Sequence, residues 1–296
     1  MQTSLQDLLK SGGPIVADGA MGTMLFELGL TQGDSPELWN VEYPDRIRSV
    51  HRQYIEAGSQ IVLTNTFGGN RLRLDLHKLA DRAAELNEAG AHLARAEADA
   101  ADRAVVVGGS IGPTGSILVP YGDLEFGAAV EAFQNQAQAL VSGGVDVLWI
   151  ETMSDTKELR AAVEACQQGA PGFPLVATMT FDTHGHTMMG VTPETALEMI
   201  NGLGVVALGG NCGNGPDEIE DVIRKMRETN PDVILVAKAN AGIPHLENGA
   251  AVYDGTPEVM ADYAVRVHHL GATVIGACCG STPDHIRAMV RALGQT

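Results

Sequence analysis

Short apolar segments rich in β-branched residues recur along the chain, and segments with helical periodicity separate most of them. The apolar segments predict eight strands, at Ile15–Ala17, Gln60–Thr64, Ala104–Gly108, Val145–Ile150, Leu175–Met179, Val205–Gly209, Val233–Ala237 and Thr273–Gly276. Apolar residues spaced three or four positions apart predict helices at Pro44–Ala57, Leu79–Ala98, Glu125–Ser142, Asp155–Gln167, Pro193–Asn201, Pro216–Glu228 and Pro257–Leu270, with another beginning near Pro283. Strand and helix therefore alternate along the whole chain.

The predicted strands are almost continuously apolar, which is typical of parallel strands that are buried on both faces. Threonines that can cap a first turn support the helix beginnings, as in Thr192–Pro193 and Thr256–Pro257. Eight strand–helix units at this length predict one α/β domain, a (β/α)8 TIM barrel over residues 1–296, with no linker dividing it.

The composition narrows the class of protein further. Hydrophobic residues make up 45% of the 296 residues, and 37 acidic against 19 basic residues give a formal net charge of −18, which disfavours nucleic-acid binding. No apolar run approaches the ~18 residues of a membrane span, and the first residues do not form a secretion signal. Four cysteines, two of them adjacent, do not make a disulfide framework, so we predict a reducing, cytoplasmic location. A homo-oligomer is left open.

Polar side chains follow the predicted strands at the points where these strands end. Chemistry in a parallel barrel takes place at the carboxyl ends of the strands, so we expect these residues to form one ring on one face. The connections Gly19–Pro44 and Gly112–Leu124 should lie over the same face as lid or donor-site loops. The ring consists of Asp18–Gly19, Thr64–Thr66, Ser110, Glu151–Thr152, Thr180, Asp182, Asn211–Cys212, Asn240 and Cys278–Cys279.

Three of the four cysteines, Cys212, Cys278 and Cys279, end the sixth and eighth strands. Three thiolates with an open fourth position suit a metal that binds an exogenous ligand, and sulfur ligands favour zinc. Successive strand residues point to opposite sides, so we expect Gly276 and Gly280 to provide a bend that brings the adjacent pair onto one ion. The alternative is three buried apolar cysteines, and the fourth, Cys166, lies on a predicted helix and is expected to be structural.

The acids Asp18 and Glu151 can act as a general acid/base pair or can hold the ammonium group of an amino-acid substrate. We favour the second role because two acids beside a cationic amine stay ionised, while capping of the next turn is the structural alternative. His184 and His186 follow the fifth strand, where a turn is favoured over metal chelation.

The strand-end motifs together resemble the homocysteine S-methyltransferase family over essentially the whole chain. They are Asp18-Gly19-Ala20-Met21-Gly22-Thr23, Leu63-Thr64-Asn65-Thr66-Phe67-Gly68, Ile111-Gly112-Pro113-Thr114-Gly115, Ile150-Glu151-Thr152, Gly210-Asn211-Cys212, Asn240-Ala241-Gly242-Ile243-Pro244 and Gly276-Ala277-Cys278-Cys279-Gly280-Ser281-Thr282-Pro283.

This resemblance implies that Cys212, Cys278 and Cys279 ligate zinc and that Asp18 and Glu151 bind the homocysteine amino group. It also implies that Gly19 and Thr64 lie near the homocysteine carboxylate and that Asn240 can occupy the open zinc position without substrate; Thr66 and Asn211 complete the predicted substrate site. In the implied reaction zinc lowers the pKa of the homocysteine thiol, and the thiolate attacks an electrophilic methyl carbon in line, giving methionine.

The methyl donor is less clearly indicated. The sequence looks similar to stand-alone bacterial barrels of the betaine–homocysteine type, with S-methylmethionine and a methyl-corrinoid protein as competing donors. A quaternary ammonium donor favours an aromatic cage, for which Trp39, Phe67 and Tyr121 are the candidates. Trp149 is expected to point inward below the site. The non-enzyme alternative is a zinc-thiolate sensor or a thiol-binding partner protein.

Overall fold

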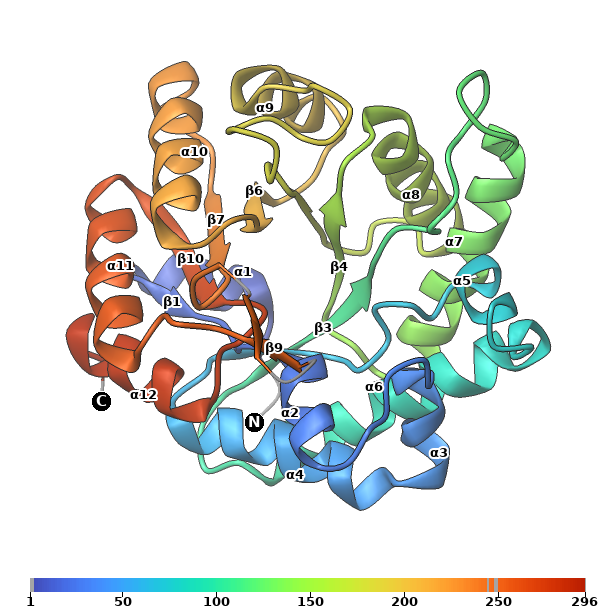
Figure 1. Cartoon of the computed structure of the whole chain (residues 1–296), viewed down its shortest axis with the longest axis horizontal. Coiled ribbons are helices and arrows are strands. Elements are labelled where there is room, and N and C mark those ends of the chain that lie inside the picture. The colour runs from blue at the N-terminus through green and yellow to red at the C-terminus, as the bar shows by residue number, and fades with distance from the viewer. Residues whose placement is uncertain (1–2, 244, 248–249, 296) are drawn as a thin grey trace.

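Eight parallel strands form a barrel with helices around it in the computed structural model, which describes residues 3–243, 245–247 and 250–295 (Figure 1). Residues 1, 2, 244, 248, 249 and 296 of the predicted domain lie outside this range, and Pro244 of the strand-end motifs is among them. The neighbours follow the order β1-β10-β7-β6-β5-β4-β3-β2. The strands are β1 (Ile15–Val16), β2 (Ile61–Leu63), β3 (Val106–Ile111), β4 (Val147–Met153), β5 (Leu175–Met179), β6 (Ala207–Cys212), β7 (Leu235–Ala239) and β10 (Ala272–Ala277).

The barrel closes between its two end strands, β1 and β2. Ala17 and Ile61 form a parallel bridge, the Asp18 N–H donates to the Ile61 carbonyl at 3.0 Å, and the Gln60 N–H donates to the Val16 carbonyl at 2.7 Å. The predicted single (β/α)8 TIM barrel is therefore confirmed.

The predicted helices are present, two of them with the predicted bounds. The main helices are α4 (Pro44–Ala57), α6 (Ala83–Ala100), α7 (Phe126–Ser142), α8 (Thr156–Gly169), α9 (Pro193–Asn201), α10 (Pro216–Thr229), α11 (Pro257–His269) and α12 (Pro283–Ala292). Short elements that the periodicity does not predict are α1 (Leu5–Ser11), α2 (Met21–Glu27), α3 (Trp39–Glu42), α5 (Arg71–Asp75) and an antiparallel hairpin of β8 (His245–Glu247) and β9 (Ala250–Val252). Across the described residues, no helix has the length and apolar character required to cross a membrane.

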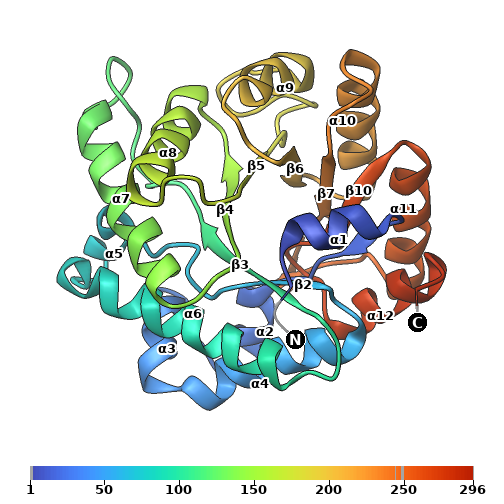
Figure 2. The same ribbon diagram turned by 180° about the vertical axis from the view of Figure 1, so that it is seen from behind.

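The barrel interior is a packed core that α1 closes at the end where the strands begin (Figure 2). Leu5 and Leu8 of α1 share one buried cluster with inward-facing strand residues such as Ile61, Val106 and Val147. Trp149 belongs to this interior cluster and is fully buried, as predicted. A larger cluster fills the space between the strands and the outer helices.

The alternation of side chains along the strands determines which residues reach the site. In β4 and β7 the residue two positions beyond the interior cluster, and in β6 and β10 the residue four positions beyond it, point to the same inward side. This inward set ends on Glu151, Asn211, Lys238 and Cys278, at the carboxyl ends of their strands.

Candidate metal and substrate site

The three strand-end cysteines converge. Their sulfur atoms all lie within 4.8 Å of one another, and the Cys212 and Cys278 sulfurs are 3.0 Å apart. By the alternation of side chains along a strand, Cys278 falls on a position that points into the barrel, whereas Cys212 and Cys279 fall on positions that point outward. The backbone at Cys212 is left-handed, with φ 60°, and this turns its side chain toward the other sulfurs. The backbone turns again after Cys279, where Gly280 has φ +80°.

The prediction of a bend at Gly276 is wrong. This glycine lies inside β10, and its φ angle is not positive. A β-carbon there would come within 3.0 Å of both the Ala17 β-carbon and the Asp18 carbonyl oxygen. Gly276 therefore permits close packing of β10 against β1, and Gly280 alone provides the turn.

The chemistry of the three thiols fits a thiophilic cation. Hydrogen bonds from Cys212 and Cys278 lower the pKa of Cys279, whereas the hydrogen bond with Cys278 raises the pKa of Cys212 well above its ordinary value. Without a metal ion, the hydrogen bonds among the three cysteines therefore favour a single thiolate, at Cys279. A divalent metal would compensate the charge of all three, and a tetrahedral zinc ion would keep one position open.

A buried lysine, which the sequence interpretation missed, accompanies the two acids. The Lys238 ammonium donates to Asp18 Oδ1 at 2.9 Å and lies 5.8 Å from the centre of the Trp149 ring. The second oxygen of Asp18 accepts the Leu63 N–H at 2.7 Å. Asp18 is thus held by a cation and a backbone donor.

Burial and charge set the protonation of this group. Burial raises the pKa of Glu151 to about 7, opposed by the positive charge of Lys238. Burial also raises the pKa of Asp18, again opposed by Lys238. Burial alone would lower the pKa of Lys238, but Asp18 and Glu151 raise it above its ordinary value.

A chain of hydroxyl groups runs across β2, β3 and β4 to Glu151. The Thr66 hydroxyl donates to the Ser110 carbonyl at 2.8 Å and lies 2.6 Å from the Thr64 hydroxyl. The Ser110 N–H donates to Thr64 at 3.0 Å, and the Ser110 hydroxyl donates to Glu151 Oε1 at 2.5 Å. These bonds fix one side of the Glu151 carboxylate.

The sulfurs, both acids and Lys238 line one cavity of about 300 Å³ at the carboxyl ends of the strands. Gly19, Thr64 and Phe67 of the predicted site also line it, as do Phe26, Glu37 and Tyr253. Thr66, Asn211 and Asn240 are buried outside its lining. The Asn240 amide donates to the Gly213 carbonyl at 2.7 Å and accepts the Cys279 N–H at 3.0 Å.

Two of the three donor-site candidates do not line this cavity. Trp39 is buried against Tyr43, with ring centres 4.9 Å apart, and Tyr121 is 78% exposed. Phe67 lines the cavity, and Phe26 of α2 is the aromatic residue that the sequence interpretation missed. The cavity thus presents one of the three predicted aromatic residues, Phe67, together with Phe26 and Tyr253.

The first long connection forms part of the cavity wall, as predicted for Gly19–Pro44. Glu37 accepts the Gly68 N–H at 2.7 Å and the Ser35 hydroxyl at 2.8 Å, which ties this connection to the residues after β2. A β-carbon on Gly19 would collide with the Ser281 hydroxyl, so the close approach of these two strand ends requires glycine. The connection Gly112–Leu124 contributes no residue to the cavity lining.

His184 and His186 are not among the residues that line the cavity with the sulfurs. His184 and His186 form the predicted turn, in which Thr183 and His186 pair with each other.

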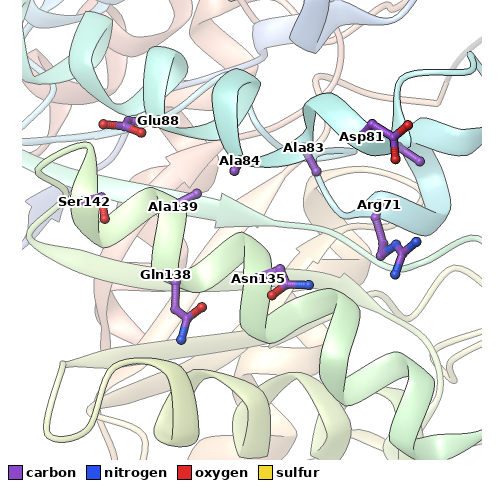
Figure 3. Close-up of a pocket in the computed structure, with 10 residues that line it drawn as sticks. Arg71, Asp81, Ala83, Ala84, Glu88, Asn135, Gln138, Ala139 and Ser142 are labelled. Carbon is purple, nitrogen blue, oxygen red and sulfur yellow. The ribbon is translucent and has the colours of Figure 1, made fainter.

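A second hollow of about 420 Å³ lies on the outer surface between α6 and α7, with Arg71, Glu88 and Gln138 around it (Figure 3). It shares no residue with the sulfur-lined cavity.

This geometry defines a class of protein: a parallel barrel that offers three thiol ligands and two buried acids to a small substrate. The chain matches the family model described as homocysteine S-methyltransferase over residues 15–293. It therefore belongs to the homocysteine S-methyltransferase family, as the motifs predicted.

Two relatives and one solved structure illustrate this membership. The chain is 34% identical to the methionine synthase of Mycobacterium leprae over 95% of its own length, and 35% identical to that of Mycobacterium tuberculosis over 98%. It spans only 24% and 25% of those two proteins, about a quarter of their length. The homocysteine methyltransferase MmuM from Escherichia coli, in its metallated form, aligns with a TM-score of 0.82 and 26% identity, covering 96% of this chain and 98% of that chain.

Proposed function

We propose that this chain transfers a methyl group from a small donor to the thiol of homocysteine, giving methionine, with zinc held by Cys212, Cys278 and Cys279. The observation that carries this proposal is the shared cavity, where the three sulfurs and the carboxylates of Asp18 and Glu151 lie together. One small amino acid can place a thiol at the sulfurs and its ammonium group at the acids. Membership of the family and the name of the curated relatives, methionine synthase, support the acceptor and the product.

Each group has a distinct task in this reaction. When bound, zinc supplies Lewis acidity, which favours the thiolate of a substrate at neutral pH. Glu151 and Asp18 orient the substrate through its ammonium group, and Gly19 and Thr64 lie on the side proposed for its carboxylate. The substrate sulfur forms a bond to the methyl carbon while the bond from that carbon to the donor breaks and its electron pair leaves with the donor. No proton moves in this step, so neither acid needs to act as a base.

We propose betaine as the donor. Phe26 and Phe67 line the cavity, and aromatic rings attract the quaternary ammonium group that carries the methyl groups of betaine. S-methylmethionine carries its methyl group on a sulfonium cation and fits the same features, so it is the second candidate. A methyl-corrinoid protein is the third.

The test is the formation of methionine by the purified chain with zinc and homocysteine, given betaine, S-methylmethionine or methylcobalamin in separate reactions. We expect methionine with betaine, no methionine with the Cys212→Ala variant, and retained activity with Cys166→Ala, whose cysteine is buried in α8. Methionine with another donor alone would correct the donor. Methionine with none of the three, in protein that binds one zinc, would favour the zinc-thiolate sensor.

A further inference from the structure

Two strand ends beside the sulfurs have a left-handed backbone without glycine. Thr152 follows the inward-facing Glu151 and has φ 61°, and Cys212 follows the inward-facing Asn211 and has φ 60°. This conformation is strained for a β-branched residue such as threonine. In both cases it turns a side chain of outward parity toward the site, and the Thr152 hydroxyl lies 3.8 Å from the Cys212 sulfur.

One buried amide connects the two left-handed residues. Asn211 Oδ1 accepts the Thr152 N–H at 2.8 Å and the Thr178 hydroxyl at 2.6 Å. Its Nδ2 donates to the Thr152 hydroxyl at 2.7 Å and to the Cys212 sulfur at 3.3 Å. Asn211 is fully buried and thus spans the ends of β4, β5 and β6. Two lone pairs and two N–H groups are its whole hydrogen-bonding capacity, so none remains for a substrate.

We propose that Asn211, supported by Thr152, is a positioning residue that protects Cys212 from methylation and so directs the methyl group to the substrate thiol. This inference rests on the proposed function, because it requires a methyl donor beside the sulfurs. A metal site with three cysteines contains three sulfurs that compete with the substrate sulfur for the same methyl carbon.

The protection has a simple physical basis. To become methylated, the Cys212 sulfur must give a lone pair to the methyl carbon while the bond to the leaving group breaks and its electrons depart with that group. A hydrogen bond from Asn211 engages a lone pair of this sulfur and lowers its nucleophilicity. A substrate sulfur in the cavity has no such donor from Asn211, because the amide is fully used. Methylation would also convert Cys212 into a neutral thioether, which is a poorer metal ligand than a thiolate.

The test measures which cysteine is methylated by iodomethane in the zinc-loaded protein, with peptide mass spectrometry resolving each cysteine. In Asn211→Leu we expect the rate at Cys212, relative to Cys279 in the same molecules, to rise about tenfold, as for the loss of one hydrogen bond to a charged group. Thr152→Val should raise the same ratio by a smaller factor. Thr178→Val is the matched control, because it removes a hydroxyl from the opposite side of the same amide, and its ratio should stay at the wild-type value.

Loss of the metal would expose all three sulfurs together, so the ratio of the rates at Cys212 and Cys279 distinguishes it from loss of protection at Cys212 alone. Zinc content is measured in parallel with a chromophoric chelator. An unchanged ratio in Asn211→Leu with zinc retained would overturn the inference, as would an equal rise in Thr178→Val. If Asn211→Leu does not fold, an unchanged ratio in Thr152→Val overturns it instead. Iodomethane needs neither homocysteine nor a natural donor, so failure of the proposed reaction would be seen separately in the methionine assay.

Discussion

At the scale of single residues, Lys238 determines which acid is available to a substrate. Both oxygens of Asp18 have partners, Lys238 and the Leu63 N–H. Glu151 accepts from Ser110 through Oε1, and Oε2 makes no hydrogen bond to the described residues. With one lysine between two acids the group carries one net negative charge when both acids are ionised. Glu151 is therefore the carboxylate on which binding of a single ammonium group should depend most.

This role of Glu151 predicts a pH dependence that can be measured with methionine, which has the ammonium group but no thiol to titrate. Without ligand the pKa of Glu151 is about 7, and only the ionised form attracts the ammonium group. We expect calorimetry to give about tenfold weaker binding at pH 6 than at pH 8, because the ionised fraction falls by that factor. Glu151→Gln should bind weakly at both values. A wild-type affinity that does not change between them would contradict the assignment.

The buried pair of Lys238 and Asp18 predicts a strongly non-additive effect on stability. Lys238→Met leaves Asp18 buried without its cation, which should lower the free energy of unfolding by about 3–5 kcal/mol. The double variant Lys238→Met/Asp18→Asn should recover most of this loss, because the amide needs no counter-charge and can still accept the Leu63 N–H. Denaturant unfolding measures both.

A surface ion pair provides the comparison for the single and double variants of Lys238 and Asp18. Lys225 and Asp221 are 2.6 Å apart, with the two side chains 30% and 41% exposed. Lys225→Met should therefore cost less than about 1 kcal/mol. If the double variant were as unstable as Lys238→Met alone, the lysine would act through packing rather than through the charge of Asp18.

The residues that the sequence predicted well are those whose chemistry coincides with a strand end. Cys212, Cys278, Cys279, Asp18 and Glu151 all meet this condition and line the same cavity. Lys238 directly follows the predicted strand Val233–Ala237 and was missed because Asn240 was taken as the polar residue of that strand end. The strand runs on to Ala239, and a charge inside a buried strand is itself a signal of a paired group. Phe26 and Glu37 come from a long connection, and no periodicity indicates which loop residues fold onto the site.

At the scale of elements, the strand pattern predicted the barrel but not the direction of every strand-end side chain. Strand alternation accounts for the inward positions of Glu151 and Cys278 in the structure. The left-handed backbones at Thr152 and Cys212 lie at residues that Asn211 hydrogen-bonds, and its contact with Thr152 joins distant segments that no pattern within one strand indicates. The hairpin β8–β9 was not predicted, because strands of three residues carry too few positions for an alternation to be recognised.

The packing of α4 against α6 predicts a loss of stability in acid. His51 of α4 is fully buried, and neither ring nitrogen has a hydrogen-bond partner among the described residues. Burial lowers its pKa from 6.5 to about 4, opposed by Glu97 of α6, which Arg48 and Arg52 already pair at 2.6 and 2.9 Å. Between pH 6.5 and 4 the unfolded chain binds the proton more readily than the folded protein. The free energy of unfolding should therefore fall by up to about 3 kcal/mol as the pH is lowered through this window.

The variant His51→Leu isolates this contribution from the other groups that titrate in the same window. We expect its stability relative to wild type to increase steadily from pH 7 to pH 4 in denaturant unfolding. The control is His77→Leu, at an exposed position after α5, for which the difference from wild type should stay constant. A constant difference for His51→Leu as well would mean that the folded protein accommodates the charged ring.

At the scale of the whole molecule, the three sulfurs connect segments far apart in the chain. Cys212 ends β6 and the adjacent cysteines follow β10, and both strands pair with β7 in the sheet. The unfolded chain separates Cys212 from Cys278 by more than sixty residues. A metal bound by all three therefore binds the folded barrel and not the unfolded chain, so its binding free energy adds to the stability of the barrel.

Zinc should therefore raise the melting temperature in a way that depends on the three cysteines. At free zinc one hundred times above its dissociation constant the stabilisation is about 2.7 kcal/mol, which corresponds to roughly 5 °C for a domain of this size. We expect differential scanning calorimetry to show this increase in the wild type and its reversal by a chelator. Cys166→Ala should keep the zinc-dependent increase, because its side chain is buried in α8 away from the cluster, whereas Cys212→Ala should lose it. An equal increase in Cys212→Ala would place the ion elsewhere on the molecule.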